Sequence, residues 1–212
     1  MLEFIAHNRS EITTLTLEHI WMVAVSIALA SSLGLPLAVA IHRKAYLKRP
    51  VLGISNLVQT IPSLALFGLL LPIAWLGERA DRLAITALTL YALLPIIRNT
   101  YEGLAGVEGS ATDAARGMGM TDRQVLWEIE IPLAMPVILA GIRVATVISI
   151  GTATIAAAVG AGGLGELIFR GLAMVDNRVI LAGAVPAAVL ALLADGVFSM
   201  LERFVRVRRA GA

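Results

Sequence analysis

The sequence contains no cysteine, few aromatic residues and few charged ones. Of its 212 residues, 5% are aromatic and 15% are charged, whereas 58% are hydrophobic. Without cysteine, the chain cannot form disulfides, cysteine-ligated zinc sites or a catalytic thiol. A soluble domain of this length would carry charge on about a quarter of its residues. Because the apolar residues come in long blocks, we predict an all-α, polytopic integral membrane protein.

Motifs for nucleotide binding, metal binding and catalysis are missing as well. The sequence has no Gly-x-x-x-x-Gly-Lys-Ser/Thr motif, which would cradle nucleotide phosphates. Residues 160–165 match Gly-x-Gly-x-x-Gly, but they follow an apolar segment instead of a strand. His7, His19 and His42 are scattered without the spacing of metal ligands. We therefore expect a chain that is not an enzyme and that binds no cofactor and no metal.

Five apolar stretches are candidates for crossing a membrane. A hydrocarbon core of about 30 Å requires roughly 20 helical residues. The predicted spans cover residues 20–41, 51–76, 82–99, 132–159 and 179–201. The third stretch is short and spans only if it borrows flanking residues or the bilayer is thin. Since no internal repeat is visible, residues 1–212 are predicted to form a single transmembrane domain.

Basic residues predict the orientation of these spans, because they concentrate in cytoplasmic loops. One side would carry most of them: Arg43, Lys44, Lys48, Arg49, Arg98, Arg116, Arg123, Arg203, Arg206, Arg208 and Arg209. The other side would carry Arg9, Arg79, Arg82, Arg170 and Arg178. We therefore expect the N-terminus outside, the C-terminus in the cytoplasm, and a cytoplasmic polar loop over residues 102–131. Trp21 and Trp75 would then anchor the outer interface.

The polar loop (residues 102–131) has a helical pattern of its own. Two short helices are predicted over residues 108–115 and 121–130, with Thr121 as the N-cap of the second. Gly119 allows a sharp bend between them. Ala114 and Ala115 add to a smooth surface of small residues that another protein could approach closely. A solvated connecting loop is the alternative, and the spacing alone leaves both open.

The stretch from Asp113 to Pro132 resembles the cytoplasmic loop of membrane subunits of bacterial ABC importers. The family pattern is Glu-Ala-Ala, three residues, Gly, nine residues, Ile, one residue, Leu-Pro. This sequence matches the spacing throughout, with Asp in place of Glu and Ile in place of Leu. The resemblance implies the type I permease fold and identifies the ATPase-coupling residues as Asp113, Ala114, Ala115, Gly119, Ile129 and Pro132. It also implies three partners: cytoplasmic ATPase subunits, a second permease subunit that is identical or related, and an extracytoplasmic solute-binding protein.

Residues 53–73, 90–107 and 141–172 resemble the osmoprotectant branch of these permeases. The resemblance implies a permease for glycine betaine, choline, carnitine or a related compatible solute in the bacterial cytoplasmic membrane. Alternating access would be driven by the separate ATPase. A permease of the same type for an amino acid such as methionine is an alternative. An ion-coupled secondary transporter ranks lower, because such proteins often show repeats and embedded coupling groups.

Polar residues within the spans are candidates for the translocation pathway. Pro62 breaks or kinks its helix, and the freed carbonyl groups must be buried in protein or face water. The candidates are Gln59, Thr60, Pro62 and Ser63 in the second span, and Ser149 and Thr152 in the fourth. The alternative is that these side chains bond to neighbouring helices or to their own backbone.

Two charges and three glycines complete the set of candidates. Arg143 and Asp195 lie inside the fourth and fifth spans at matching predicted depths, so an ion pair between them is expected. The alternative is that Arg143 extends to the cytoplasmic interface on its own. Gly160, Gly162 and Gly163 would form an outer hinge between these two spans, or else a simple flexible turn.

Overall fold

The computed structural model describes residues 8–210, and side chains as far as Val205. His7 and the side chains of the arginines at 206, 208 and 209 lie outside this description. Within it, every regular element is a helix: α2 (Arg9–Arg43), η1 (Ala45–Leu47), α3 (Lys48–Thr60), α4 (Ser63–Leu70), α5 (Ala74–Gly77), α6 (Ala80–Ala105), α7 (Gly109–Gly117), α8 (Asp122–Gln124), η2 (Val125–Glu130), α9 (Ile131–Ala156), η3 (Ala157–Val159), α10 (Gly165–Met174) and α11 (Asn177–Ala210). The predicted all-α class is confirmed.

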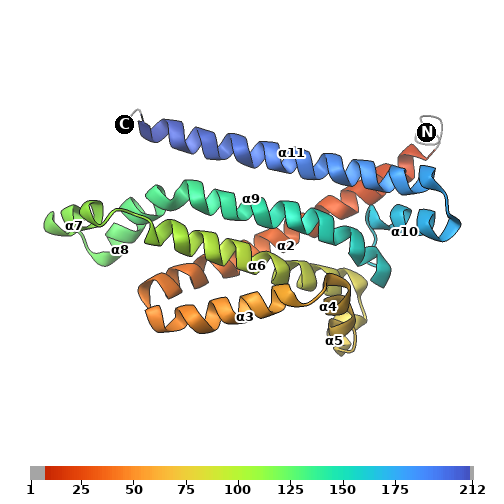
Figure 1. The fold of residues 1–212 in the computed structure, drawn as a ribbon, viewed down its shortest axis with the longest axis horizontal. Coiled ribbons are helices and arrows are strands. Elements are labelled where there is room, and N and C mark those ends of the chain that lie inside the picture. Colours follow the sequence, from red (N-terminus) through yellow and green to blue (C-terminus); the bar gives the residue numbers. More distant parts are fainter. Residues whose placement is uncertain (1–7, 211–212) are drawn as a thin grey trace.

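Long helices run side by side along the length of the molecule (Figure 1). Four of them, counting the continuous helix from Asp122 to Val159 as one, are long and apolar enough to cross a membrane. The helices α7 and α8 lie at one end of the bundle, near the end of α11, and α4, α5 and α10 lie at the other end, near the start of α2 (Figure 1).

Helix α6 is the centre of the bundle, with 61% of its most apolar window buried. Small residues let its neighbours approach closely. A Cβ added to Gly34 of α2 would lie 3.0 Å from Ile96, and one added to Gly141 of α9 would lie 2.6 Å from Asn99. Between apolar helices in lipid, packing of this kind replaces the hydrophobic driving force. The predicted third span, which looked short, is long enough because α6 includes flanking polar residues at both ends.

The predicted second span differs most from the structure. It is not one kinked helix over residues 51–76, since α3 and α4 meet at an angle of 102°. Ile61 and Pro62 both have extended backbones, with ψ of 126° and 137°. Proline disfavours the helical region for the residue before it, which explains the extended Ile61, and Pro62 has no N–H to continue the helix. The expected break is present, and it is much sharper than a kink.

The second helix of the polar loop also differs from the expectation of a separate element. It continues through η2, a π-helix, directly into α9. Pro132 near the start of α9 has no N–H to donate to the preceding turn. The wider π turn lets the helix continue across this position without the missing bond. Movement of the polar loop is therefore linked to the fourth predicted span by continuous helix.

Candidate functional site

The turn between α7 and α8 has a defined geometry. Met120 N donates to Ala115 O (3.1 Å) and Gly119 N donates to Arg116 O (2.9 Å), which is the Schellman arrangement at a helix end. Gly119 has a φ of 87°, a conformation that favours glycine. Thr121 and Gln124 then form a capping box at the start of α8, so the predicted N-cap is confirmed. The bend therefore has a defined backbone conformation that favours glycine at position 119.

The exposed surface of this bend differs from the one expected. Asp113, Ala114 and Gly119 are exposed, but Ala115 is only 1% exposed and packs inside the loop. Ala115 therefore cannot contribute a contact on an outer docking face, and its small size serves packing within the loop. Met118 is 76% exposed at the tip, and no pattern in the sequence singled it out. Ile129 and Pro132 are half-buried behind the exposed face.

A cavity of about 370 Å³ lies where α3 meets α4. It brings together residues from the two predicted polar segments, because Thr152 of α9 lies beside the α3–α4 break. Its lining consists of Gln59, Thr60, Ile61, Pro62, Ser63, Tyr91, Ile148 and Thr152. Ser149 does not line it and is fully buried. Five of the six predicted pathway residues therefore share one cavity.

Tyr91 of α6 contacts residues on both sides of this cavity. It was not identified as a candidate from the sequence. Gln59 Nε2 donates to Tyr91 O (3.0 Å), and the Tyr91 hydroxyl donates to Ile61 O at the break. A tyrosine within an apolar span is the signal that could have found it, because its hydroxyl needs a partner when buried. The hydroxyls of Thr60 and Thr152 bond back to their own helices, as the alternative interpretation expected.

The cavity suits a polar solute, and it provides no charged side chain as a counter-ion. Its lining offers an amide and hydroxyl groups but no charged side chain. The last turn of α3 ends at the break, where the carbonyl groups carry the negative end of the helix dipole. The carbonyl groups of Leu57, Val58 and Ile61 accept hydrogen bonds there from Thr60, Ile61 and Tyr91. Such a site attracts the positive part of a zwitterion or a cation without holding it as tightly as a carboxylate would.

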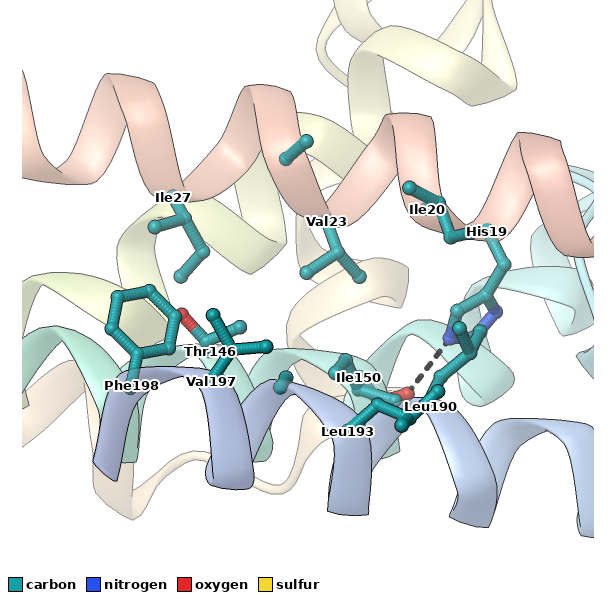
Figure 2. A pocket seen from close by; sticks show the side chains of 12 residues that line it. His19, Ile20, Val23, Ile27, Thr146, Ile150, Leu190, Leu193, Val197 and Phe198 are labelled. Carbon is teal, nitrogen blue, oxygen red and sulfur yellow. Dashed lines mark hydrogen bonds between the residues drawn. The ribbon is translucent and has the colours of Figure 1, made fainter. Parts of the chain in front are cut away.

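A second cavity, of about 400 Å³, lies between α2, α9 and α11 and is almost wholly apolar (Figure 2). Side chains such as Val23, Leu193 and Phe198 face it. Its histidine, His19, has its Nε2 3.0 Å from Ile150 O, so this ring nitrogen carries the proton that it donates (Figure 2). The Thr146 hydroxyl donates to Ile142 O, and among the described residues Nδ1 of His19 is buried without a hydrogen-bond partner. This cavity therefore offers a solute few hydrogen bonds.

Arg143 and Asp195 lie in direct contact. Arg143 Nε and Nη2 donate to the two carboxylate oxygens of Asp195 at 2.6 and 3.0 Å, a bidentate pair between α9 and α11. Glu202 is a second acid, 3.6 Å from Arg143 Nη1. It was missed because it lies beyond the predicted end of the fifth span. Its spacing of two helical turns from Asp195 was the available signal, since such residues share a helix face.

The glycine turn is attached to α2 and is not free. Gly160, Gly162 and Gly163 all have positive φ values, between 77° and 83°. Gly163 N donates to Glu18 Oε2 at 3.1 Å. The next helix, α10, is also tied to α2, because Arg170 Nη1 lies 2.7 Å from Glu11 Oε1. A hinge at this turn would therefore have to move together with α2.

This attachment gives a graded prediction for the glycines. Alanine at Gly160 meets open space, so only the positive φ opposes it, at a cost of about 1 kcal/mol. Alanine at Gly162 would also place its Cβ 2.6 Å from Glu18 Oε2. We expect Gly162→Ala to lower solute uptake clearly more than Gly160→Ala, with Gly53→Ala as the unstrained control. Equal uptake by all three variants, measured in whole cells at matched expression, would contradict a functional turn.

Known proteins resemble the chain over most of its length. Residues 30–207 match the family described as "Binding-protein-dependent transport system inner membrane component". The osmoprotectant import permease protein OsmW of Salmonella typhimurium is 43% identical over 95% of this chain and 94% of its own length. The glycine betaine/carnitine/choline transport system permease protein OpuCB of Bacillus subtilis is 40% identical over 97% of this chain and 93% of its own. A chain in an inward-facing structure of the MetNI methionine ABC transporter has a TM-score of 0.81 and 26% identity, over 89% of this chain and 93% of that one.

Proposed function

Because the chain belongs to the family of inner membrane components of binding-protein-dependent transport systems, we propose that it is the permease of an osmoprotectant importer. The solute would be glycine betaine, choline, carnitine or a related quaternary amine. The observation that carries this choice is the identity, over nearly the whole chain, of 43% with a permease named for osmoprotectants and of 40% with one named for glycine betaine, carnitine and choline. The 26% identity with the methionine transporter makes an amino acid the second candidate.

The cavity at the α3–α4 break is proposed as part of the translocation pathway. It collects Gln59, Thr60, Pro62, Ser63 and Thr152, and the negative end of the α3 dipole beside it favours a positively charged group. Polar groups facing lipid would be costly, so this face is proposed to be covered by a second permease subunit, with the solute passing between the two. Ser149, which is fully buried, is withdrawn from the proposed lining.

The energy for transport must come from partner proteins. The sequence has no phosphate-binding motif of its own. A separate ATPase is proposed to dock on Asp113, Ala114, Met118 and Gly119, and a binding protein to deliver the solute on the opposite side. With that assignment the polar loop and the C-terminus are cytoplasmic. A solute that binds both conformations equally cannot shift them, so the bias must arise from ATP-dependent contacts at this loop.

The substrate is tested by transport in proteoliposomes that contain the permease, its ATPase and its binding protein. We expect ATP-dependent uptake of labelled glycine betaine, choline or carnitine and no uptake of methionine. Uptake of methionine alone would replace the proposed solute while leaving the transporter class intact. Uptake driven by an ion gradient in the absence of ATP would overturn the class.

The cavity is tested by Thr152→Val, which removes a hydroxyl from the lining with little change of shape. Loss of one hydrogen-bonding group costs about 1 kcal/mol, so we expect about a fivefold loss in uptake at low solute concentration. Thr154→Val is the matched control, because Thr154 lies two residues further along α9 and does not line the cavity. Equal effects of the two substitutions would argue against a pathway at this cavity.

A further inference from the structure

An ion-pair cluster around a buried carboxylate joins the polar loop to the end of α2. Glu130, the last residue of η2, is 4% exposed. Its Oε2 lies 3.1 Å from Arg43 Nη2 and 3.6 Å from His42 Nε2. The same Arg43 nitrogen donates to Asp122 O at 2.9 Å. One guanidinium group therefore holds both ends of the segment from α8 through η2.

The π-helical turn explains how Glu130 reaches this buried place. In η2 the buried residues are Val125, Leu126 and Glu130. Bonding between residues five apart widens the turn, so Val125 and Glu130 come onto one side of the helix. Single π turns inside α-helices are frequent at functional sites. A carboxylate on this inward side would be costly without a cation, so the geometry of η2 depends on Arg43.

The surroundings of the cluster connect two further helices. Lys48 Nζ, at the start of α3, lies 4.3 Å from the centre of the Tyr101 ring near the end of α6. His42 packs edge-on against the same ring, with 6.4 Å between ring centroids. The ends of α2, α3 and α6 therefore meet at the point where the loop is attached, and Arg43 is the group that contacts the loop directly.

Helix α2 connects this point to the other end of the molecule. It is a single helix of 35 residues that begins at Arg9 and ends at Arg43. Near its start, Glu18 accepts the hydrogen bond from Gly163 in the glycine turn. Arg43 near its end holds Asp122 and Glu130. A continuous helix with specific contacts at both ends can transmit a displacement, although Pro36 within α2 removes one of its backbone hydrogen bonds.

We propose that Arg43 and Glu130 are positioning residues that transmit movement of the polar loop to α2. They would thereby couple the ATPase cycle to the opening of the pathway. This inference rests on the proposed function, because it assumes that an ATPase moves the loop. It adds a route to the glycine turn through α2, separate from the continuous helix that leads from η2 into α9.

The test compares charge-removing variants in the assembled importer. Arg43→Gln and Glu130→Gln each break the pair, and the double variant removes both charges. Arg98→Gln is the control, because Arg98 forms an exposed pair with Glu102 at 3.7 Å. The measured quantity is the number of solute molecules imported per ATP hydrolysed. We expect this ratio to fall about fivefold or more in both single variants, because typical coupling energies correspond to changes of this size. The ATPase should remain bound in both. The double variant should match the singles instead of multiplying their effects.

A second measurement does not depend on the solute. The absence of native cysteine allows spin labels at Tyr46→Cys, beside the end of α2, and Glu128→Cys in η2, both exposed positions. On addition of ATP, the distance between the labels should stay constant in the native background and change or broaden with Arg43→Gln. Lack of any import by the wild-type importer would contradict the proposed function alone. The distance between the labels would still test whether Arg43 couples the loop to α2.

Three results would overturn the coupling role. The first is an import ratio for Arg43→Gln equal to that of Arg98→Gln. The second is an unchanged label distance in the Arg43→Gln variant. The third is failure of both the single and the double variants to assemble, which would identify the cluster as a structural support. Partial recovery of the import ratio by Arg43→Lys, which keeps the charge, would further support the proposal.

Discussion

Gly119→Asp is expected to abolish transport while leaving the membrane helices folded. Gly119 is exposed at the bend after α7, and a Cβ added there meets nothing within 4 Å. The substitution therefore creates no clash within the chain. It does place an anion in the face proposed to dock on the ATPase, where a charge without a partner would lose its water. A cost of about 3 kcal/mol for such a charge weakens docking roughly 100-fold.

Two control variants distinguish the effect of the added charge from the effect of backbone strain at position 119. Gly119 has a φ of 87°, so any side chain is strained there, although Asn and Asp tolerate this region best. Gly119→Asn imposes the same strain without the charge and should reduce transport only mildly. Gly109→Asp adds the same charge at the exposed start of α7, away from the bend, and also meets open space. The measurements are co-purification of the ATPase and solute-stimulated ATP hydrolysis. Normal transport by Gly119→Asp would eliminate the docking assignment.

The fold class could be predicted because hydrophobicity in lipid is a strong local signal. Long apolar blocks must form helices that satisfy their own backbone groups. The angle between α3 and α4 was beyond this reasoning. Pro62 predicts a break, but the value of 102° depends on the partners that donate hydrogen bonds to the carbonyl groups at the break. Tyr91, which donates to Ile61 O, is one of those partners, and it lies on a different helix.

The polar loop shows a similar division between local and long-range information. The spacing of Ala114, Ala115 and Gly119 could identify a bend with small residues, and the N-cap at Thr121 follows from local chemistry. The burial of Ala115 could not be predicted, because it depends on how α7 packs on the segment that follows. The contact of Glu130 could not be predicted either, because its partner Arg43 is 87 positions away in the sequence.

The ion pair between α9 and α11 leads to the second large expected effect. Arg143 faces two acids, Asp195 and Glu202, so single substitutions of Arg143 and of Asp195 should not be equivalent. Arg143→Ala leaves two carboxylates near each other without a cation. Asp195→Ala leaves Arg143 with Glu202 as a remaining partner. A lone charge inside a membrane costs about 2.5–3.5 kcal/mol, which corresponds to a shift of roughly 100-fold in assembly. We expect Arg143→Ala to lower the amount of assembled importer severely and Asp195→Ala to lower it less.

Exchanging the two charges distinguishes an ion pair from two independent roles. Arg143→Asp combined with Asp195→Arg recreates the pair, but it places the new carboxylate near Glu202. Rescue of assembly should therefore be partial, and adding Glu202→Gln should improve it, because the repulsion is removed. The measurements are the yield of complex on gel filtration in detergent and the uptake per assembled complex. If the exchange restores nothing with or without Glu202→Gln, the two residues act separately. Graded rescue would instead show that one cation between two acids sets how tightly α11 is held against α9.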